Sequence, residues 1–231
     1  MGRAPHGGSV IELEGVGYGY GGEALLRGLD LLLAPGSFHF LTGPSGSGKT
    51  TFLRLLARQI VPMEGRLSLF GEDAAGMTRD QVALVRRRVG MVHQDLAFLD
   101  HLPVAENVAL PLTVAGREDA EAVRELLAWT GLTARAGSHP PELSGGERQR
   151  LALARAVVMS PDVVLADEPT GNVDWEMSMR LMTLLVELNR MGKTILIATH
   201  DLGLIRAMKG RVEARTLRIR ERGLELAGAE L

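Results

Sequence analysis

Short apolar runs that alternate with helix-like segments dominate the hydrophobic pattern of this 231-residue chain. Three of these runs have few polar positions and are typical of buried strands: Phe38–Thr42, Asp162–Ala166 and Thr194–Thr199. Three further segments are predicted to be helices: Thr51–Gln59, Glu147–Ser160 and Glu176–Arg190. Strands that alternate with helices in this way predict an α/β fold with a parallel core sheet.

The remaining segments divide a predicted single domain, residues 1–231, into lobes. About residues 10–40 and 64–92 are expected to form an antiparallel β lobe, and about residues 95–160 an α-helical lobe. The run Arg211–Arg222 alternates apolar with charged residues and predicts exposed hairpin strands. No internal repeat occurs, which argues against two tandem copies of one domain.

The glycine-rich stretch after Phe38–Thr42 predicts a phosphate-binding loop. Its glycines permit backbone angles that turn N–H groups toward phosphate oxygens, and the helix that follows presents its positive N-terminus. Lys49 would reach the β- and γ-phosphates, and the Thr50 hydroxyl would bind Mg²⁺. The alternative is an ordinary glycine-rich turn with a solvated lysine. The predicted nucleotide-binding residues are Gly43, Pro44, Ser45, Gly46, Ser47, Gly48, Lys49, Thr50 and Thr51.

Two acidic residues follow the apolar run Asp162–Ala166. Asp167 is placed to contact Mg²⁺ beside the phosphate loop, and Glu168 to polarise the water that attacks the γ-phosphate. Most acidic pairs in such a position only start a turn, and Pro169 and Gly171 do favour one here. The phosphate loop in the same chain favours the catalytic interpretation.

The sequence Ser144–Gly145–Gly146–Glu147 predicts a second anion site at the start of a helix. Ser144 is a typical N-cap, and the two glycines leave the helix N-terminus uncovered. A capped helix after a loop explains the serine but not two adjacent glycines. Because the chain has one phosphate loop, we expect this second site to serve the γ-phosphate of a partner copy.

Gln94 and His200 each follow a strand-like run. Gln94 could contact Mg²⁺ and the attacking water, and His200 could contact the γ-phosphate. Taken alone, each residue would more often be an ordinary polar side chain at the end of a strand.

Together these motifs resemble the ATP-binding subunits of ABC systems. The resemblance implies an ABC nucleotide-binding domain with a RecA-like P-loop core, in which GPSGSGKT is the Walker A loop, LSGGE the signature and VVLADE the Walker B strand. It also implies that Gln94 is the Q-loop glutamine, His200 the switch histidine and Asp174 a cross-interface residue of the D-loop at 172–174. Tyr20 fits best as the aromatic residue that stacks on adenine, although Tyr18 stays an alternative.

The residues that flank the motifs are similar to those of bacterial cell-division ATP-binding proteins, the FtsE family. RRRVGMVHQD, LADEPTGNVD and ATHD carry this narrower resemblance. It implies Mg²⁺-dependent ATP hydrolysis, an ATP-dependent homodimer and a polytopic FtsX-like membrane partner in the control of cell-wall hydrolysis. The alternative is the ATPase subunit of a transporter that releases lipoproteins or exports small amphiphiles.

The composition and the motif content argue against other functional classes. The formal charge of −2 gives no general drive toward nucleic acid, and the absence of cysteine excludes disulfides and thiolate metal sites. ABC-type ATPases of DNA or ribosomes usually carry coiled-coil insertions or two fused ATPase domains, which this chain lacks. No apolar run approaches the roughly 20 residues that cross a bilayer. We therefore expect a cytoplasmic protein held at the inner face of the membrane by its partner.

A partner surface is expected between Gln94 and about Leu112. Apolar side chains there, Phe98 among them, lie on a loop-rich segment. The alternative is that they close the core of the helical lobe. The cluster Arg86–Arg88 is interpreted as the solvated face of a short helix, with docking to a partner loop or lipid headgroups as its alternative.

Overall fold

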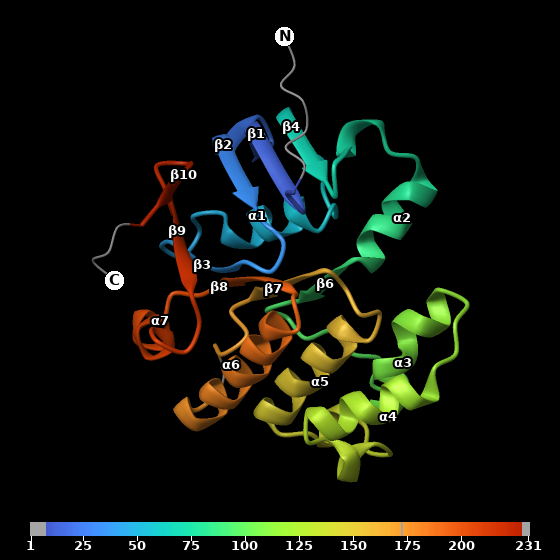
Figure 1. Ribbon diagram of the computed structural model, residues 1–231. Helices are drawn as coiled ribbons and strands as arrows, with labels where there is room; N and C mark the ends of the chain where they lie inside the picture. Colours follow the sequence, from blue (N-terminus) through green and yellow to red (C-terminus); the bar gives the residue numbers. More distant parts are fainter. Residues whose placement is uncertain (1–7, 172, 228–231) are drawn as a thin grey trace.

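A computed structural model describes residues 8–171 and 173–227, which form two sheets with helices against them (Figure 1). A four-stranded antiparallel sheet has the order β2-β1-β4-β5, and a six-stranded sheet has the order β10-β9-β3-β8-β7-β6. The strands are β1 (Ile11–Tyr20), β2 (Glu23–Leu33), β3 (Phe38–Thr42), β4 (Glu64–Leu69), β5 (Glu72–Asp73), β6 (Val89–Val92), β7 (Val163–Asp167), β8 (Thr194–Ala198), β9 (Ala214–Arg220) and β10 (Gly223–Leu226).

The central strands of the larger sheet are parallel and buried on both faces. In β7, Val163 and Leu165 join a core shared with the antiparallel sheet, whereas Val164 and Ala166 face the helices on the other side. Side chains alternate between the two faces of a strand, so a strand covered on both must be apolar throughout. This explains why β3, β7 and β8 read as continuous apolar runs.

The helices begin mostly at short polar residues that cap their first turn. Ser144, Asp119 and Asp174, for example, accept a hydrogen bond from a backbone N–H three residues further on. The helices are α1 (Lys49–Leu56), α2 (Arg79–Arg87), α3 (Val104–Val114), α4 (Ala120–Trp129), α5 (Gly145–Val157), α6 (Trp175–Arg190) and α7 (Leu202–Met208). Short 3-10 turns span Ala74–Gly76, Thr133–Arg135 and Pro140–Glu142.

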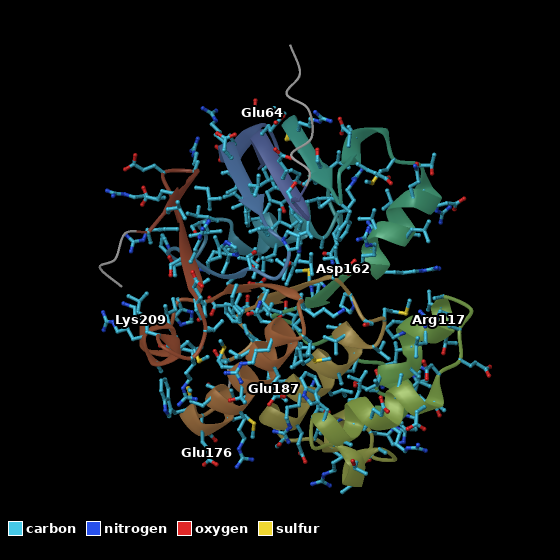
Figure 2. All side chains as sticks on the ribbon, viewed as in Figure 1. Glu64, Arg117, Asp162, Glu176, Glu187 and Lys209 are labelled. Carbon is cyan, nitrogen blue, oxygen red and sulfur yellow. The ribbon has the colours of Figure 1, made fainter. Side chains whose placement is uncertain are left out.

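The helical lobe has its own buried cluster between α3, α4 and α5. Asn107, fully buried in α3, donates to the carbonyls of Leu99, Leu102 and Pro103 and accepts from the Leu99 N–H. These bonds fix the loop that precedes α3. Figure 2 shows charged side chains at the outer edge of the molecule, including Arg117 beside α3, Glu64 on β4 and Lys209 after α7.

Two boundaries differ from the sequence-based expectation. Phe38–Phe40 and Val89–Val92, predicted within the antiparallel lobe, belong to β3 and β6 of the six-stranded sheet. Of the hairpin predicted for Arg211–Arg222, only β9 lies in that range, since the second strand is β10 (Gly223–Leu226); β9 also pairs in parallel with β3 and buries Leu217 and Ile219. Side chains alternate between the two faces of any strand, so a strand that buries one face and an exposed hairpin strand show the same alternation of apolar and polar residues. The sequence pattern therefore does not reveal that β9 joins the core sheet.

Candidate nucleotide site

The phosphate loop connects the carboxyl end of β3 to α1, as the sequence predicts. Gly48 caps the helix at φ 99°, a left-handed angle that favours glycine, and Gly43 adopts φ 152°. A Cβ at Gly43 would lie 2.7 Å from the Ser47 Oγ and 3.0 Å from the Ile219 carbonyl oxygen. The helix begins two residues earlier than expected, at Lys49, so Lys49 and Thr50 stand in its first turn.

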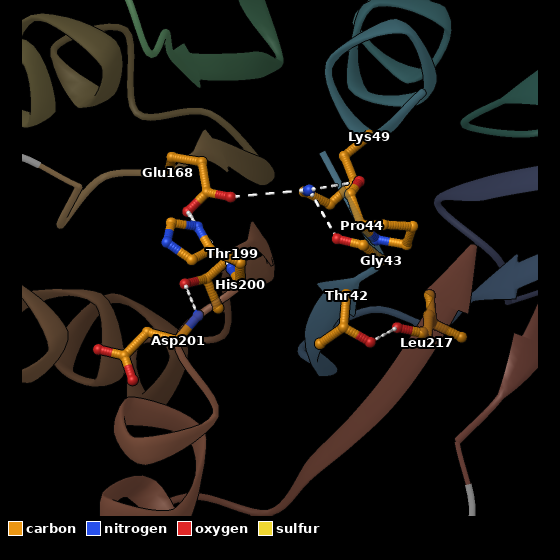
Figure 3. A network of polar contacts seen from close by, with 9 residues as sticks. All are labelled: Thr42, Gly43, Pro44, Lys49, Glu168, Thr199, His200, Asp201 and Leu217. Atoms are coloured by element: carbon orange, nitrogen blue, oxygen red, sulfur yellow. Dashed lines mark hydrogen bonds and ion pairs between the residues drawn. The ribbon is translucent and has the colours of Figure 1, made fainter. Parts of the chain in front are cut away.

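Lys49 is held at the mouth of the loop. Its ammonium donates to the carbonyl oxygens of Gly43 at 2.9 Å and Pro44 at 3.4 Å, and lies 3.8 Å from Glu168 Oε1 (Figure 3). Both partners of this ion pair are nearly buried, with side chains 10% exposed. The Lys49 charge is therefore little screened by solvent and available to a phosphate group.

Glu168 connects the ends of β7 and β8. Its backbone N–H donates to the Ala198 carbonyl at 2.9 Å, and its Oε2 lies 3.0 Å from His200 Nδ1 (Figure 3). The residue has φ 47°, a strained angle for a side chain with a Cβ. Strain of this kind persists only where the surroundings impose it, and here it aims the carboxylate at Lys49 and His200. The imidazole itself is 73% exposed at the rim.

Asp167 is the last residue of β7 rather than the residue after the strand. Burial raises the pKa of its carboxyl and the charge of Glu168 adds to this effect, while a hydrogen bond from Thr50 and the charge of Lys49 oppose it. Its Oδ1 is buried without a hydrogen-bond partner. A buried, unpartnered carboxylate oxygen beside a hydroxyl fits a hard cation such as Mg²⁺.

A cavity of about 660 Å³ brings most of the predicted site residues together. It is lined by Leu25, Gly43, Pro44, Ser45, Gly46, Gly48, Lys49, Thr50, Thr51, Gln94, Asp167, Glu168, Gly171 and His200. Ser47 lines an adjoining cavity of about 760 Å³, which shares Leu25 and part of the phosphate loop with the first. Within residues 8–171 and 173–227, no group of three or more acidic, histidine or cysteine side chains is arranged to hold a metal ion.

Of the two tyrosines, Tyr20 is the more exposed and the one that lines a cavity beside the phosphate loop. It is 53% exposed, lines the adjoining cavity, and places its hydroxyl 3.5 Å from Thr51 Oγ1. Tyr18 instead packs against the buried cluster beneath the antiparallel sheet, edge-on to Tyr20 with ring centroids 5.1 Å apart. The geometry favours Tyr20 as the aromatic surface for adenine.

Ser144 caps α5 as expected, but the two glycines lie inside the helix. The Ser144 Oγ accepts from the Glu147 N–H at 3.3 Å, and the Glu147 carboxylate accepts from the Ser144 N–H at 2.8 Å. Gly146 is buried, and a Cβ there would lie 2.7 Å from Met177 Cγ. Of the two glycines, Gly146 therefore permits close packing of α5 on α6 rather than leaving the N-terminus uncovered.

The Ser144–Glu147 segment and Asp174 do not line the cavity that holds Lys49. Asp174 caps α6 through the Met177 N–H at 2.8 Å, while Asn172 lies outside the described residues. Sequence reasoning missed Met177, which joins the two helix starts, because no local pattern marks it. It also missed Arg135, whose Nε donates to Glu147 Oε1 at 2.9 Å across 12 residues of chain.

The expected partner surface after Gln94 is only partly internal, because Ala97 and Leu99 are exposed while Leu96 and Phe98 are half-buried. Leu96 and Phe98 pack against buried clusters, and the Arg155 guanidinium lies 4.7 Å from the Phe98 ring centroid. A cavity of about 540 Å³ opens instead between α2, the end of α3 and α5. Its rim carries Arg87 and Val114, the latter 78% exposed.

Arg86 and Arg88 of the basic cluster are engaged within the chain. Arg86 donates to the Arg58 carbonyl at 2.8 Å, and Arg88 pairs with Asp162 at 2.6 Å. All three arginines are nevertheless exposed, which matches the predicted solvated face of a short helix. In the described part of the chain, no helix is long and apolar enough to cross a bilayer.

Comparisons with known proteins point in one direction. A family model described as "ABC transporter" matches residues 26–171. The cell division ATP-binding protein FtsE of Bacillus subtilis (strain 168) is 40% identical over 209 residues, covering 89% of this chain and 92% of the relative. FtsE of Escherichia coli (strain K12) is 42% identical over 200 residues, covering 85% and 90%. The dimeric post-hydrolysis structure of the ATP-binding cassette MJ0796 with ADP and Pi superposes with a TM-score of 0.83 at 31% identity, covering 93% of this chain and 96% of that one.

Proposed function

Because the chain belongs to the ABC transporter family and is one of its ATP-binding, ATP-hydrolysing subunits, we propose that two copies close around two ATP molecules to drive a membrane partner. This membership confirms the predicted fold, an ABC nucleotide-binding domain. The relatives named FtsE support a role in bacterial cell division. In that role the partner is a polytopic FtsX-like subunit, and the output is control of cell-wall hydrolysis.

The observation that carries this proposal is that one copy supplies an incomplete site. The cavity beside Lys49 contains the phosphate loop and Glu168, and none of its lining residues comes from the signature segment at Ser144. The capped, exposed start of α5 is a second place where backbone N–H groups can meet an anion. A head-to-tail pair brings each α5 start onto the other copy's phosphate loop. The dimeric form of the MJ0796 cassette supports this arrangement.

Hydrolysis in the closed pair follows from the groups at the ends of β7 and β8. Lys49 neutralises phosphate charge, and the Glu168 carboxylate orients the attacking water and draws its proton. His200, 3.0 Å from Glu168, holds that carboxylate and faces the γ-phosphate from the rim. Gln94 lines the same cavity, where it would be placed to contact the attacking water or the metal.

Thr50 and Asp167 are the residues that would hold Mg²⁺. Their oxygens are hard ligands, and the unpartnered Oδ1 of Asp167 gives a cation a position beside the phosphates. Bound there, Mg²⁺ would supply charge neutralisation of the β- and γ-phosphates.

The groove between α2, α3 and α5 is the proposed docking place of the membrane subunit. Its floor is apolar around Met91 and Leu110, and its rim is basic at Arg86 and Arg87. A short cytoplasmic helix with apolar and acidic residues matches this surface. Docking there places the chain at the inner face of the membrane through its partner.

The dimer is tested with Glu168→Gln, which keeps the shape of the site but removes its base. With Mg²⁺ and ATP, this variant should sediment as a dimer, and without nucleotide as a monomer. Glu168→Gln combined with Lys49→Ala, which loses the phosphate contact, should stay monomeric. A monomer of Glu168→Gln at saturating ATP would refute the proposal.

A further inference from the structure

Arg135 lies outside both nucleotide-side cavities, yet its side chain reaches the signature segment. Its Nε donates to Glu147 Oε1 at 2.9 Å, and the two side chains are 47% and 18% exposed. Among the described residues this is the one ion pair that Glu147 makes. The contact joins the turn Thr133–Arg135 to the first turn of α5.

The turn that carries Arg135 is fixed to the start of α3. The Ser138 N–H donates to the Arg135 carbonyl at 2.9 Å, and the Val104 N–H donates to the Ser138 carbonyl at 2.9 Å. The Ala105 N–H donates to the Ala136 carbonyl at 3.0 Å. Arg135 therefore holds its guanidinium from a backbone that is bonded on both sides.

Both carboxylate oxygens of Glu147 accept hydrogen bonds, and these bonds help to fix the position of the Ser144 side chain. One oxygen accepts from Arg135 and the other from the Ser144 N–H, while the Ser144 Oγ accepts from the Glu147 N–H. The Ser144 side chain also contributes a hydrogen bond to the Glu147 carboxylate, so Glu147 holds this residue at the start of the helix. At the exposed start of α5, the backbone N–H groups of the first turn are suitable donors to a phosphate oxygen.

The same carboxylate creates an electrostatic problem at this position. Hydrogen bonds from Ser144 and then from Arg135 lower the pKa of Glu147 to about 2, so it is ionised at neutral pH. A negative charge in the first turn stabilises the isolated helix. It also repels any triphosphate that approaches the same N-terminus.

We infer that Arg135 is a positioning residue that neutralises the negative charge of Glu147. The reciprocal hydrogen bonds between Ser144 and Glu147, which form a capping box, can then orient Ser144 without the Glu147 carboxylate repelling the ATP of a second copy. This inference rests on the proposed dimer. Arg135 acts through Glu147 and touches no substrate itself. The capping box fixes the position of Ser144, and the positive charge of the Arg135 guanidinium allows an anion to approach the same helix start.

The test is a double-mutant cycle in the Glu168→Gln background, with dimer dissociation constants measured by sedimentation in Mg²⁺ and ATP. Arg135→Gln should weaken the dimer about tenfold, because one charge at an exposed helix terminus changes affinity by about two- to fivefold and the dimer contains two such sites. Binding of ATP to monomers should be unchanged. Adding Glu147→Gln should restore affinity to within about threefold, because the uncompensated charge is gone. Arg135→Lys, which keeps the charge, should retain most of the affinity.

Arg124→Gln is the matched control, since Arg124 pairs with Glu121 on the outer side of α4 in the same lobe. It should leave the dimer unchanged. Equal dimerisation of Arg135→Gln and its parent would overturn the inference alone. So would a loss that Glu147→Gln fails to rescue, because a purely structural ion pair behaves that way. A parent that stays monomeric would overturn the proposed function, and the inference with it.

Discussion

Phe98 distinguishes a docking surface from an internal core most clearly, because the two interpretations predict opposite effects of its removal. Its ring packs against the cluster of the core helices and against that of the helical lobe. Arg155, which donates to the Ala97 carbonyl at 2.7 Å, covers the ring. Phe98→Ala should therefore destabilise the fold.

The magnitude follows from these contacts. Removing a phenylalanine ring from a full core costs about 3–5 kcal/mol, and partial exposure of Phe98 lowers this to about 2–3 kcal/mol. Loss of the guanidinium contact adds about 0.5–1 kcal/mol. The sum, about 3 kcal/mol, corresponds to a melting temperature about 6–12 °C lower in a domain of this size.

Calorimetry or denaturant unfolding measures this effect directly. Leu99→Ala is the neighbouring control, since Leu99 is 38% exposed and should shift the melting temperature little. If Phe98→Ala melts within about 2 °C of the parent but loses its membrane partner, the packing argument is refuted. The surface predicted from the sequence would then be correct.

Asp167, His39 and Tyr20 give three further predictions. Burial raises the pKa of Asp167, so protonation of its carboxyl stabilises the fold at acid pH, and this stabilisation is lost as pH rises through that pKa. At neutral pH, Asp167→Asn should therefore melt a few degrees higher than the parent. In a phosphate-release assay, its Mg²⁺-dependent hydrolysis should fall at least about a hundredfold. Burial, helped by the charge of Arg215, lowers the pKa of His39 from 6.5 to about 4. Unfolding then takes up a proton in this range, so the parent should lose stability as pH falls from 6.5 to 4, and His39→Leu should flatten that slope in urea titrations. Tyr20→Ala should weaken a fluorescent ATP analogue about tenfold, whereas Tyr18→Ala should lower the melting temperature instead.

Local motifs made the phosphate loop predictable. Glycine spacing, a buried strand and a helix start all act within Phe38–Leu56, and each has a direct physical meaning in the sequence. Asp167 and Glu168 follow in the same way from one apolar strand. The strained φ of 47° at Glu168 has no local signal, because the bonds that impose it come from the end of β8.

Contacts between segments that are distant in the chain could not be predicted from the sequence. One of the two strands that pair with β3 is β9, more than 170 residues later, and the alternation in β9 would look the same in an exposed hairpin. Gly146 and Met177 meet because α5 and α6 pack together, which the glycine alone does not reveal. Arg135 reaches Glu147 through the folded loop before the signature, and an isolated arginine there reads as a surface charge.

The placement of one copy's signature segment over the other copy's phosphate loop is tested most directly by cross-linking. The chain contains no cysteine, so Ser45→Cys and Glu142→Cys, at two exposed positions, would supply the only thiols. In the Glu168→Gln background with Mg²⁺ and ATP, a short bis-maleimide should join the phosphate-loop thiol of one copy to the thiol before the signature of another copy. The product should be a covalent dimer that needs nucleotide. A cross-link formed only within single copies, or equally well without ATP, would contradict a shared site.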